Sequence, residues 1–263
     1  METLIQASYL IAAALFILGL KQMSSPVTAR RGILWAGAGM VLATLATFLT
    51  PEILDSPQST TNIILIIVAI ALGGGYAWVS GKKVAMTDMP QMIAMYNGMG
   101  GGAAATIAAV ELLKASTEAS HDVTGATTIA DALGADVAIL GILGAVIGTI
   151  SFSGSIIAWA KLDGRLNRSK LLPAQHLVNA VLAIATAGFA IAIYFSADLN
   201  TIITFYVLAL ILGIFITVPV GGADMPVIIS LFNALTGLAV GFEGYVLGNA
   251  AMIIAGIVVG SAG

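Results

Sequence analysis

Long apolar runs separated by short polar connections make up most of this chain. A helix needs about 20 mostly apolar residues to cross about 30 Å of hydrocarbon. Nine segments fit this length, at residues 4–20, 33–50, 63–80, 91–113, 136–160, 177–196, 201–220, 226–242 and 245–263. The main exception to the short connections is the polar stretch from Ala115 to Ala135, which contains His121. The pattern predicts an all-α integral membrane protein, with one transmembrane domain of nine helices over residues 1–263.

Composition supports this class and excludes several others. Of the 263 residues, 59% are hydrophobic and 9% are charged, and the mean hydropathy is +1.04. A soluble domain has about a quarter charged residues, so the composition excludes one. The unbroken apolar runs also argue against an outer-membrane barrel, whose strands alternate. The absence of cysteine excludes a disulfide framework and a catalytic thiol, and the net charge of −3 argues against nucleic acid as a partner.

Basic residues predict the orientation in the membrane. Nine of the ten follow the first, third or fifth segment: Lys21, Arg30, Arg31, Lys82, Lys83, Lys161, Arg165, Arg168 and Lys170. Because cytoplasmic loops are enriched in Lys and Arg, we expect the N-terminus outside and the C-terminus in the cytoplasm. The last apolar run stops at Gly263 without a basic or aromatic anchor. We therefore expect the native polypeptide to continue into a cytoplasmic region.

The same phrase begins two of the predicted helices. Asp-Met-Pro at 88–90 leads to Asn97, and Asp-Met-Pro at 224–226 leads to Asn233 at the same spacing. Asp is a preferred N-cap and Pro is tolerated in the first helical turn, so each phrase predicts a helix start. Nine residues at 1.5 Å each place both asparagines about 13–14 Å deep, near the bilayer centre. The matching phrases indicate a parallel internal repeat, which many transport folds contain.

Two interpretations of these polar residues remain open. The asparagines either join helices by hydrogen bonds worth about 1 kcal/mol or less, or they line a path through the membrane. Asp88 and Asp224 either cap helices or offer charge to a cytoplasmic partner. Further neutral candidates are Ser230, Thr149, Ser151, Ser153 and Ser155. Hydroxyl groups in apolar helices often bond to the carbonyl of the preceding turn, which is a structural role.

Titratable residues are placed near the ends of the predicted segments. Glu111 and Asp136 lie near outer ends, His176 at an inner end and His121 in an outer loop. A proton relay usually needs a titratable group at depth. A proton path here therefore requires water and neutral groups, or a titratable residue from a partner. Glycines four apart predict close helix contacts, at Gly98/Gly102, Gly144/Gly148 and Gly256/Gly260.

Four ordered motifs, at residues 82–90, 152–162, 221–227 and 260–263, resemble the membrane domain of the beta subunit of proton-translocating NAD(P) transhydrogenase. The resemblance implies nine membrane helices followed by a cytoplasmic NADP(H)-binding domain, which these residues lack. It implies an enzyme that transfers hydride from NADH to NADP+, coupled to inward proton flow. This chain alone would bind no nucleotide cofactor or metal and catalyse nothing.

The resemblance also implies partners and a location. The partners are an alpha subunit, with membrane helices and an NAD(H)-binding domain, and the NADP(H)-binding domain of the same chain. The expected assembly is a homodimer of alpha–beta units in a lipid bilayer. The location is the bacterial cytoplasmic (inner) membrane, which the chain crosses several times.

Site residues follow from the matched motifs. The family's functional serine and asparagine correspond to Ser155 and Asn233, and Asp224 lies at the cytoplasmic mouth with Asp88 as its counterpart. Gly263 matches a glycine close to the hinge before the NADP(H)-binding domain. Many relatives have histidine where this chain has Asn97, and asparagine does not titrate. We expect that the histidine role has moved to the alpha subunit.

Two other functions are compatible with the same residues. A self-contained secondary transporter would use the repeat and the deep amides to bind a solute without partners. A structural scaffold would tolerate apolar replacements of Asn97, Ser155 and Asn233.

Overall fold

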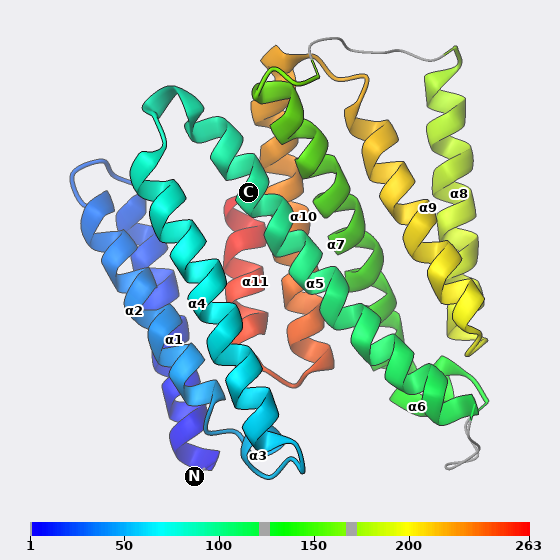
Figure 1. Ribbon diagram of the computed structural model, residues 1–263, viewed down its shortest axis with the longest axis horizontal. Coiled ribbons are helices and arrows are strands. Elements are labelled where there is room, and N and C mark those ends of the chain that lie inside the picture. Colours follow the sequence, from blue (N-terminus) through cyan, green and yellow to red (C-terminus); the bar gives the residue numbers. More distant parts are fainter. Residues whose placement is uncertain (1, 121–126, 167–172) are drawn as a thin grey trace. The chain divides into compact units, whose positions relative to one another are not determined.

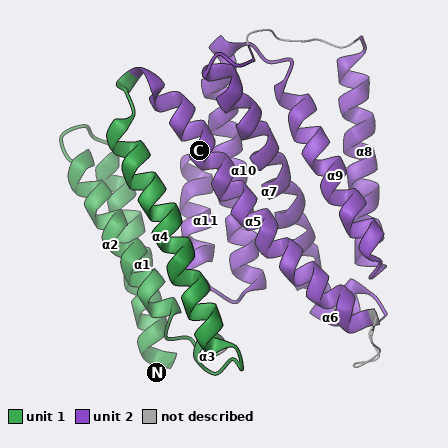
Figure 2. Ribbon diagram, viewed as in Figure 1, with its two compact units in different colours: residues 1–86 green, residues 87–263 purple. Residues whose placement is uncertain are grey.

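Helices make up most of the described part of the chain, which in the computed structural model of Figure 1 comprises residues 2–120, 127–166 and 173–263. Within these residues the protein is 86% helical and has no strands. His121, Arg168 and Lys170 lie outside the described residues. The chain falls into two compact units, residues 1–86 and 87–263, which are coloured separately in Figure 2 and described separately below. The all-α prediction is confirmed.

The first unit contains helices α1 (Glu2–Met23), α2 (Ala29–Thr47), α3 (Pro51–Leu54) and α4 (Ser59–Lys83). Glycines bring α1 and α2 together, because a Cβ on Gly19 would lie 2.9 Å from the Gly32 carbonyl oxygen. At the other end of the pair, the hydroxyl groups of Tyr9 and Thr47 form a hydrogen bond of 2.9 Å. Helix α4 buries none of its residues.

The second unit contains α5 (Met89–Ser120), α6 (Ile129–Leu133), α7 (Ala135–Leu162), α8 (Gln175–Tyr194), α9 (Leu199–Thr217), α10 (Met225–Val246) and α11 (Ala250–Ala262). Helix α7 packs against α5, α9 and α10, and α10 packs against α11. Small residues dominate the buried positions of α7, among them Gly141, Gly144, Ala145 and Gly148. Small residues let helix backbones approach closely in an apolar solvent, so α7 forms the centre of this unit.

Six of the described helices are long and apolar enough to cross a membrane, namely α1, α4, α7, α8, α9 and α10. The nine predicted segments each overlap a helix, the other three being α2, α5 and α11. Helix α11 has 13 residues and is shorter than a usual span. The number of nine spans and the orientation of the termini therefore stay predictions.

The two Asp-Met-Pro phrases fold alike. In each phrase the Asp is the last residue of a 3-10 turn, η1 (Met86–Asp88) or η2 (Gly222–Asp224). The Met that follows is the first residue of a long helix, α5 or α10. The predicted helix starts are confirmed. Capping by Asp224 is not, because its side chain makes no capping hydrogen bond. Its backbone has helical angles (φ −91°, ψ −3°) continued from the turn, whereas a capping side chain needs an extended residue.

The end of α10 differs from the sequence-based segment. The segment 226–242 stops short, since the helix continues to Val246 and ends where Gly248 adopts φ +62°. The side chain of Asn249 then accepts a hydrogen bond of 3.0 Å from the Met252 amide and begins α11. Glu243 therefore lies inside a helix rather than in a connection.

Candidate functional site

Asn97 on α5 and Ser155 on α7 meet across the helix interface. The Asn97 Nδ2 donates a hydrogen bond of 2.9 Å to the Ser155 Oγ. Asn97 is half-buried and Ser155 is 0% exposed. Gly98 permits this approach, because a Cβ there would lie 3.1 Å from the Ser155 Cβ. The structure thus brings together two of the three residues predicted to form a path.

A second polar contact lies one turn away on α7. The Ser151 hydroxyl donates a hydrogen bond of 2.9 Å to the Phe232 carbonyl oxygen of α10. Its oxygen also lies 2.5 Å from the Thr236 hydroxyl oxygen, and Thr236 donates this bond while the one hydrogen of Ser151 is given to Phe232. Asn97, Ser155, Ser151 and Thr236 form what we call the polar seam, in which α7 is bonded to both α5 and α10.

The seam also relates the two repeat helices. From Asn97 to Gly101 along α5, the facing residues of α7 step backward from Ser155 to Gly148. Contacts of α10 also step backward along α7. Both repeat helices therefore run antiparallel to α7 and parallel to each other, as the matching Asp-Met-Pro phrases predicted.

The other hydroxyl groups of α7 bond within their own helix. The Thr149 hydroxyl donates to the Ala145 carbonyl oxygen at 2.6 Å, and the Ser153 hydroxyl donates to the Thr149 carbonyl oxygen at 3.2 Å. Both residues are buried. This is the structural role weighed for serines in apolar helices. Ser153 is therefore a natural control for Ser155.

Asn233 does not join the polar seam. It lies at the contact between α10 and α11, where a Cβ on Gly263 would be 3.0 Å from the Asn233 Nδ2 and 2.6 Å from the Ala234 nitrogen. The Ser230 hydroxyl donates a hydrogen bond of 2.7 Å to the Gly263 carbonyl oxygen. No hydrogen bond within the described ranges links Asn233 to Asn97 or Ser155. The structure instead gathers Ser230, Asn233 and Gly263.

Asp88 and Asp224 are both exposed. Asp88 accepts a hydrogen bond of 3.1 Å from the Thr87 hydroxyl group. Neither carboxylate forms an ion pair with the residues that the structure describes. Both charges are therefore accessible at the ends of α5 and α10 that the repeat phrase begins.

Lys161 is a buried cation that the sequence analysis counted as a loop charge. It lies in the last turn of α7 and is 9% exposed. Its Nζ donates to the carbonyl oxygens of Val218 and Val220, which follow α9 and precede η2. Lys161 thus joins α7, the helix of Ser155, to the segment that leads into the turn of Asp224. The sequence offered one sign that Lys161 belongs to the helix: it follows Ser155 by six residues, which is less than two helical turns.

Glu243 is the second buried charged residue that the sequence analysis missed. It is 0% exposed, and neither carboxyl oxygen has a hydrogen-bond partner among the described residues. A Cβ on Gly144 of α7 would overlap its Oε1. The helix stop formed by Gly248 and Asn249 could have located it, since glycine with positive φ and asparagine at an N-cap mark helix boundaries.

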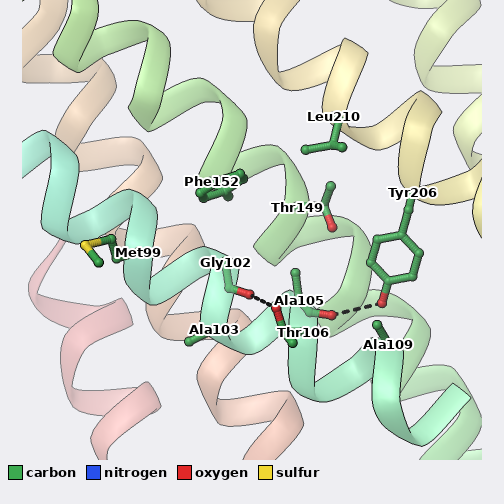
Figure 3. A pocket seen from close by; sticks show the side chains of 10 residues that line it. All are labelled: Met99, Gly102, Ala103, Ala105, Thr106, Ala109, Thr149, Phe152, Tyr206 and Leu210. Atoms are coloured by element: carbon green, nitrogen blue, oxygen red, sulfur yellow. Dashed lines mark hydrogen bonds between the residues drawn. The ribbon is translucent and has the colours of Figure 1, made fainter. Parts of the chain in front are cut away.

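An apolar hollow lies beside the seam, between α5, α7 and α9. Figure 3 shows its lining, and its volume is about 450 Å³. Its three polar side chains are already hydrogen-bonded to backbone carbonyl oxygens: Thr106 at 2.8 Å, Thr149 at 2.6 Å and Tyr206 at 3.0 Å. The hollow therefore offers no free polar side chain with which to orient a solute.

Comparisons with known proteins extend the motif resemblance to the whole chain. A family model described as NAD(P) transhydrogenase beta subunit matches residues 5–263. The chain is also similar to NAD(P) transhydrogenase subunit beta of Rhodospirillum rubrum, with 37% identity over 263 residues. The same values hold for that subunit from a named strain of the species. The match covers 100% of this chain and 54% of the relative, so the chain spans about half the length of the curated relatives it matches.

Proposed function

Because the chain belongs to the NAD(P) transhydrogenase beta subunit family, we propose that it is the proton-conducting membrane domain of a proton-translocating NAD(P) transhydrogenase. In the whole enzyme, inward proton flow would drive hydride transfer from NADH to NADP+. The observation that carries the proposal is the polar seam, which joins α5, α7 and α10 through side-chain hydrogen bonds between buried or half-buried groups.

The chemistry of the seam suits proton passage. A hydroxyl group donates one hydrogen bond and accepts others, so Ser155, Ser151 and Thr236 can each take a proton on one side and release one on the other. The Asn97 amide does not titrate and instead orients the Ser155 hydroxyl by donating to it. Water between these groups would complete the route, and a histidine of the alpha subunit would supply a titratable group.

Coupling would use the ends of the same helices. Asn233 lies against Gly263, so a shift of α10 displaces the end of α11. Lys161 links α7 to the turn before Asp224, so movement at the seam reaches the surface where Asp88 and Asp224 are exposed. For coupling to occur, proton binding must favour one state of the NADP(H)-binding domain over another.

The assembly in this proposal is larger than the chain. It includes the alpha subunit with its NAD(H)-binding domain, an NADP(H)-binding domain after residue 263, and a second alpha–beta unit. The 263 residues form one transmembrane domain of nine spans in the bacterial inner membrane, with the N-terminus outside. This chain contributes neither nucleotide site.

Cysteine labelling tests the orientation, because the chain has no cysteine of its own. Leu166→Cys, in the connection after α7, should react with an impermeant maleimide only when the cytoplasmic face is accessible. Thr127→Cys, on the opposite side, should react from outside in intact cells. The reverse labelling pattern, or labelling of both positions from one side, would contradict the proposed orientation.

Activity is tested on the full-length subunit reconstituted in vesicles with its alpha subunit. NADH and NADP+ are added, and NADPH formation and internal pH are followed for the wild type and Asn233→Leu. The proposal expects proton movement with hydride transfer in the wild type, and loss or uncoupling of both in the variant. If the wild type shows neither, the transhydrogenase role is wrong. Saturable solute uptake by the chain without partners would then support the secondary transporter.

A further inference from the structure

Glu243 is a carboxyl group without a counter-ion inside the second unit. It lies in the last turn of α10 and is 0% exposed. Neither of its carboxyl oxygens has a hydrogen-bond partner among the residues that the structure describes. Buried polar groups nearly always have a partner, so a fully buried and unpaired carboxyl group requires an explanation.

The charged and titratable groups around Glu243 offer no compensation. Glu111 of α5 and Tyr206 of α9 interact with it electrostatically. Glu111 is already paired with Lys114 at 2.6 Å, and the Tyr206 hydroxyl donates to a backbone carbonyl of α5.

Helices α7, α10 and α11 add no cation at this position either. Asp136 of α7 accepts a hydrogen bond of 2.7 Å from Tyr245 of α10. The sequence of α11, from Ala250 to Ala262, contains no titratable residue. Hence none of the described charged groups near Glu243 balances a negative charge on it.

Glu243 lies on α10 where it can exchange protons with the polar seam. Glu243 follows Thr236 by seven residues, which is about 10 Å along α10 and two helical turns. The two side chains therefore lie on one face of α10, and both are directed at α7, where Thr236 meets Ser151 and Glu243 meets Gly144. Gly144 makes the room, because any side chain there would overlap the carboxyl group. A carboxyl group thus continues the line of the seam toward the far end of α10.

We propose that Glu243 is the titratable group of the proton route within this chain, taking up and releasing protons on the side of the seam opposite Asn97. This inference rests on the proposed function and supplies the group that Asn97 cannot provide. In the loading step an Oε–H bond forms as a hydronium ion gives up its proton and becomes water. In the release step the carboxyl group returns that proton to water next to Thr236.

Burial favours the protonated, neutral form of the Glu243 carboxyl group over its ionised form. An ionised carboxylate without a partner costs far more to bury than a neutral acid, which has polar atoms but no charge. A carboxyl group in this position can therefore hold a proton during part of the cycle. A purely structural role does not explain a carboxyl group here, because a glutamine of the same shape would fill the space beside Gly144 without a titratable group.

The test uses the complete enzyme in vesicles with three variants. Glu243→Gln keeps the shape but cannot titrate, and Glu243→Asp keeps the carboxyl group. Glu111→Gln is the control, because it removes a nearby carboxyl group that already has a partner. NADH-driven NADP+ reduction and proton uptake are measured together. Infrared difference spectra between acid and alkaline pH report the carbonyl stretch of a protonated carboxylic acid.

The inference predicts that Glu243→Gln lowers coupled proton uptake by about tenfold or more, while Glu243→Asp retains part of it and Glu111→Gln stays close to wild type. A carboxylic-acid band should titrate in the wild type and in Glu111→Gln, and should be missing from Glu243→Gln. The inference is wrong if Glu243→Gln conducts like the wild type, or if it loses activity while the band persists. Failure of the proposed function would appear differently, as a wild-type enzyme that moves no protons.

Discussion

Asn97 and Ser155 are 58 residues apart in sequence, yet a hydrogen bond of 2.9 Å joins their side chains across α5 and α7. Ser155 is fully buried, so its hydroxyl group has no access to bulk solvent. The amide donates, which directs the Ser155 oxygen to accept from α5 and leaves the hydroxyl hydrogen free to point elsewhere. A neutral residue can therefore set the direction in which a hydroxyl group passes a proton.

Replacing Asn97 should separate conduction from stability. Asn97→Leu removes the donor, and we expect coupled proton uptake to fall about tenfold or more. The stability of the domain should change by only about 1 kcal/mol, which is typical of an amide hydrogen bond between membrane helices. Proton uptake in vesicles and thermal unfolding in detergent measure the two effects.

Asn97→His is the matched comparison, since histidine can both donate to Ser155 and titrate near neutral pH. We expect this variant to retain coupling and to add a pH dependence between about pH 5 and 8. Leucine and histidine variants with equal activity would show that this position carries no protons.

Gly256 should be among the least replaceable residues for stability. A Cβ there would overlap the Gly241 backbone and lie 2.6 Å from the Gly237 carbonyl oxygen, so α10 and α11 would have to separate. We expect Gly256→Ala to destabilise the domain by about 1–3 kcal/mol, the usual cost of overpacking. Thermal unfolding in detergent measures this cost.

Gly188→Ala is the control for that substitution. Nothing lies within 4 Å of a Cβ at Gly188, which is also within a helix. Alanine should leave stability unchanged or raise it by up to about 1 kcal/mol, because glycine is the poorer helix former. Equal losses from both substitutions would mean that close approach of α10 and α11 is not what stabilises the fold.

Sequence patterns predicted the helices better than their ends. Apolar runs located every long helix, and the repeated Asp-Met-Pro phrase located two helix starts, since both depend on local chemistry. The end of α10 was misplaced because the predicted segment stops at residue 242, just before Glu243, whereas the helix continues through Glu243 to Val246. A charged residue marks a helix end only where water reaches it, and burial is decided by neighbouring helices.

The candidate site was predictable only in part for the same reason. The motifs singled out Asn97, Ser155, Asn233 and Gly263, but not which of them meet. No motif marks Thr236, whose oxygen lies 2.5 Å from that of Ser151, 85 residues away in sequence. Such contacts depend on the rotation of each helix about its own axis, which packing of small residues determines.

Acid should weaken the start of α9 through Asp198. Its carboxylate accepts hydrogen bonds from the Thr201 amide at 2.8 Å and the Thr201 hydroxyl group at 2.9 Å. These bonds, with the backbone amide first, hold the pKa of Asp198 below its ordinary value. A lowered pKa stabilises the fold above the unfolded value of roughly 4 and loses this contribution as the pH falls through the folded value.

Asp198→Asn isolates that contribution, because asparagine can still cap the helix but does not titrate. We expect the wild type to lose more thermal stability than the variant between about pH 6 and pH 3. Parallel losses in the two proteins would show that Asp198 makes no pH-dependent contribution.

Proton uptake by Ser155→Ala, compared with Ser153→Ala, tests the polar seam most directly. The two serines are both buried on α7, but Ser155 bonds to α5 whereas Ser153 bonds only to its own helix. In the complete enzyme in vesicles, we expect Ser155→Ala to lower coupled proton uptake about tenfold or more and Ser153→Ala to stay near the wild-type rate. Equal rates in the two variants, whether both high or both low, would contradict a proton route through the seam.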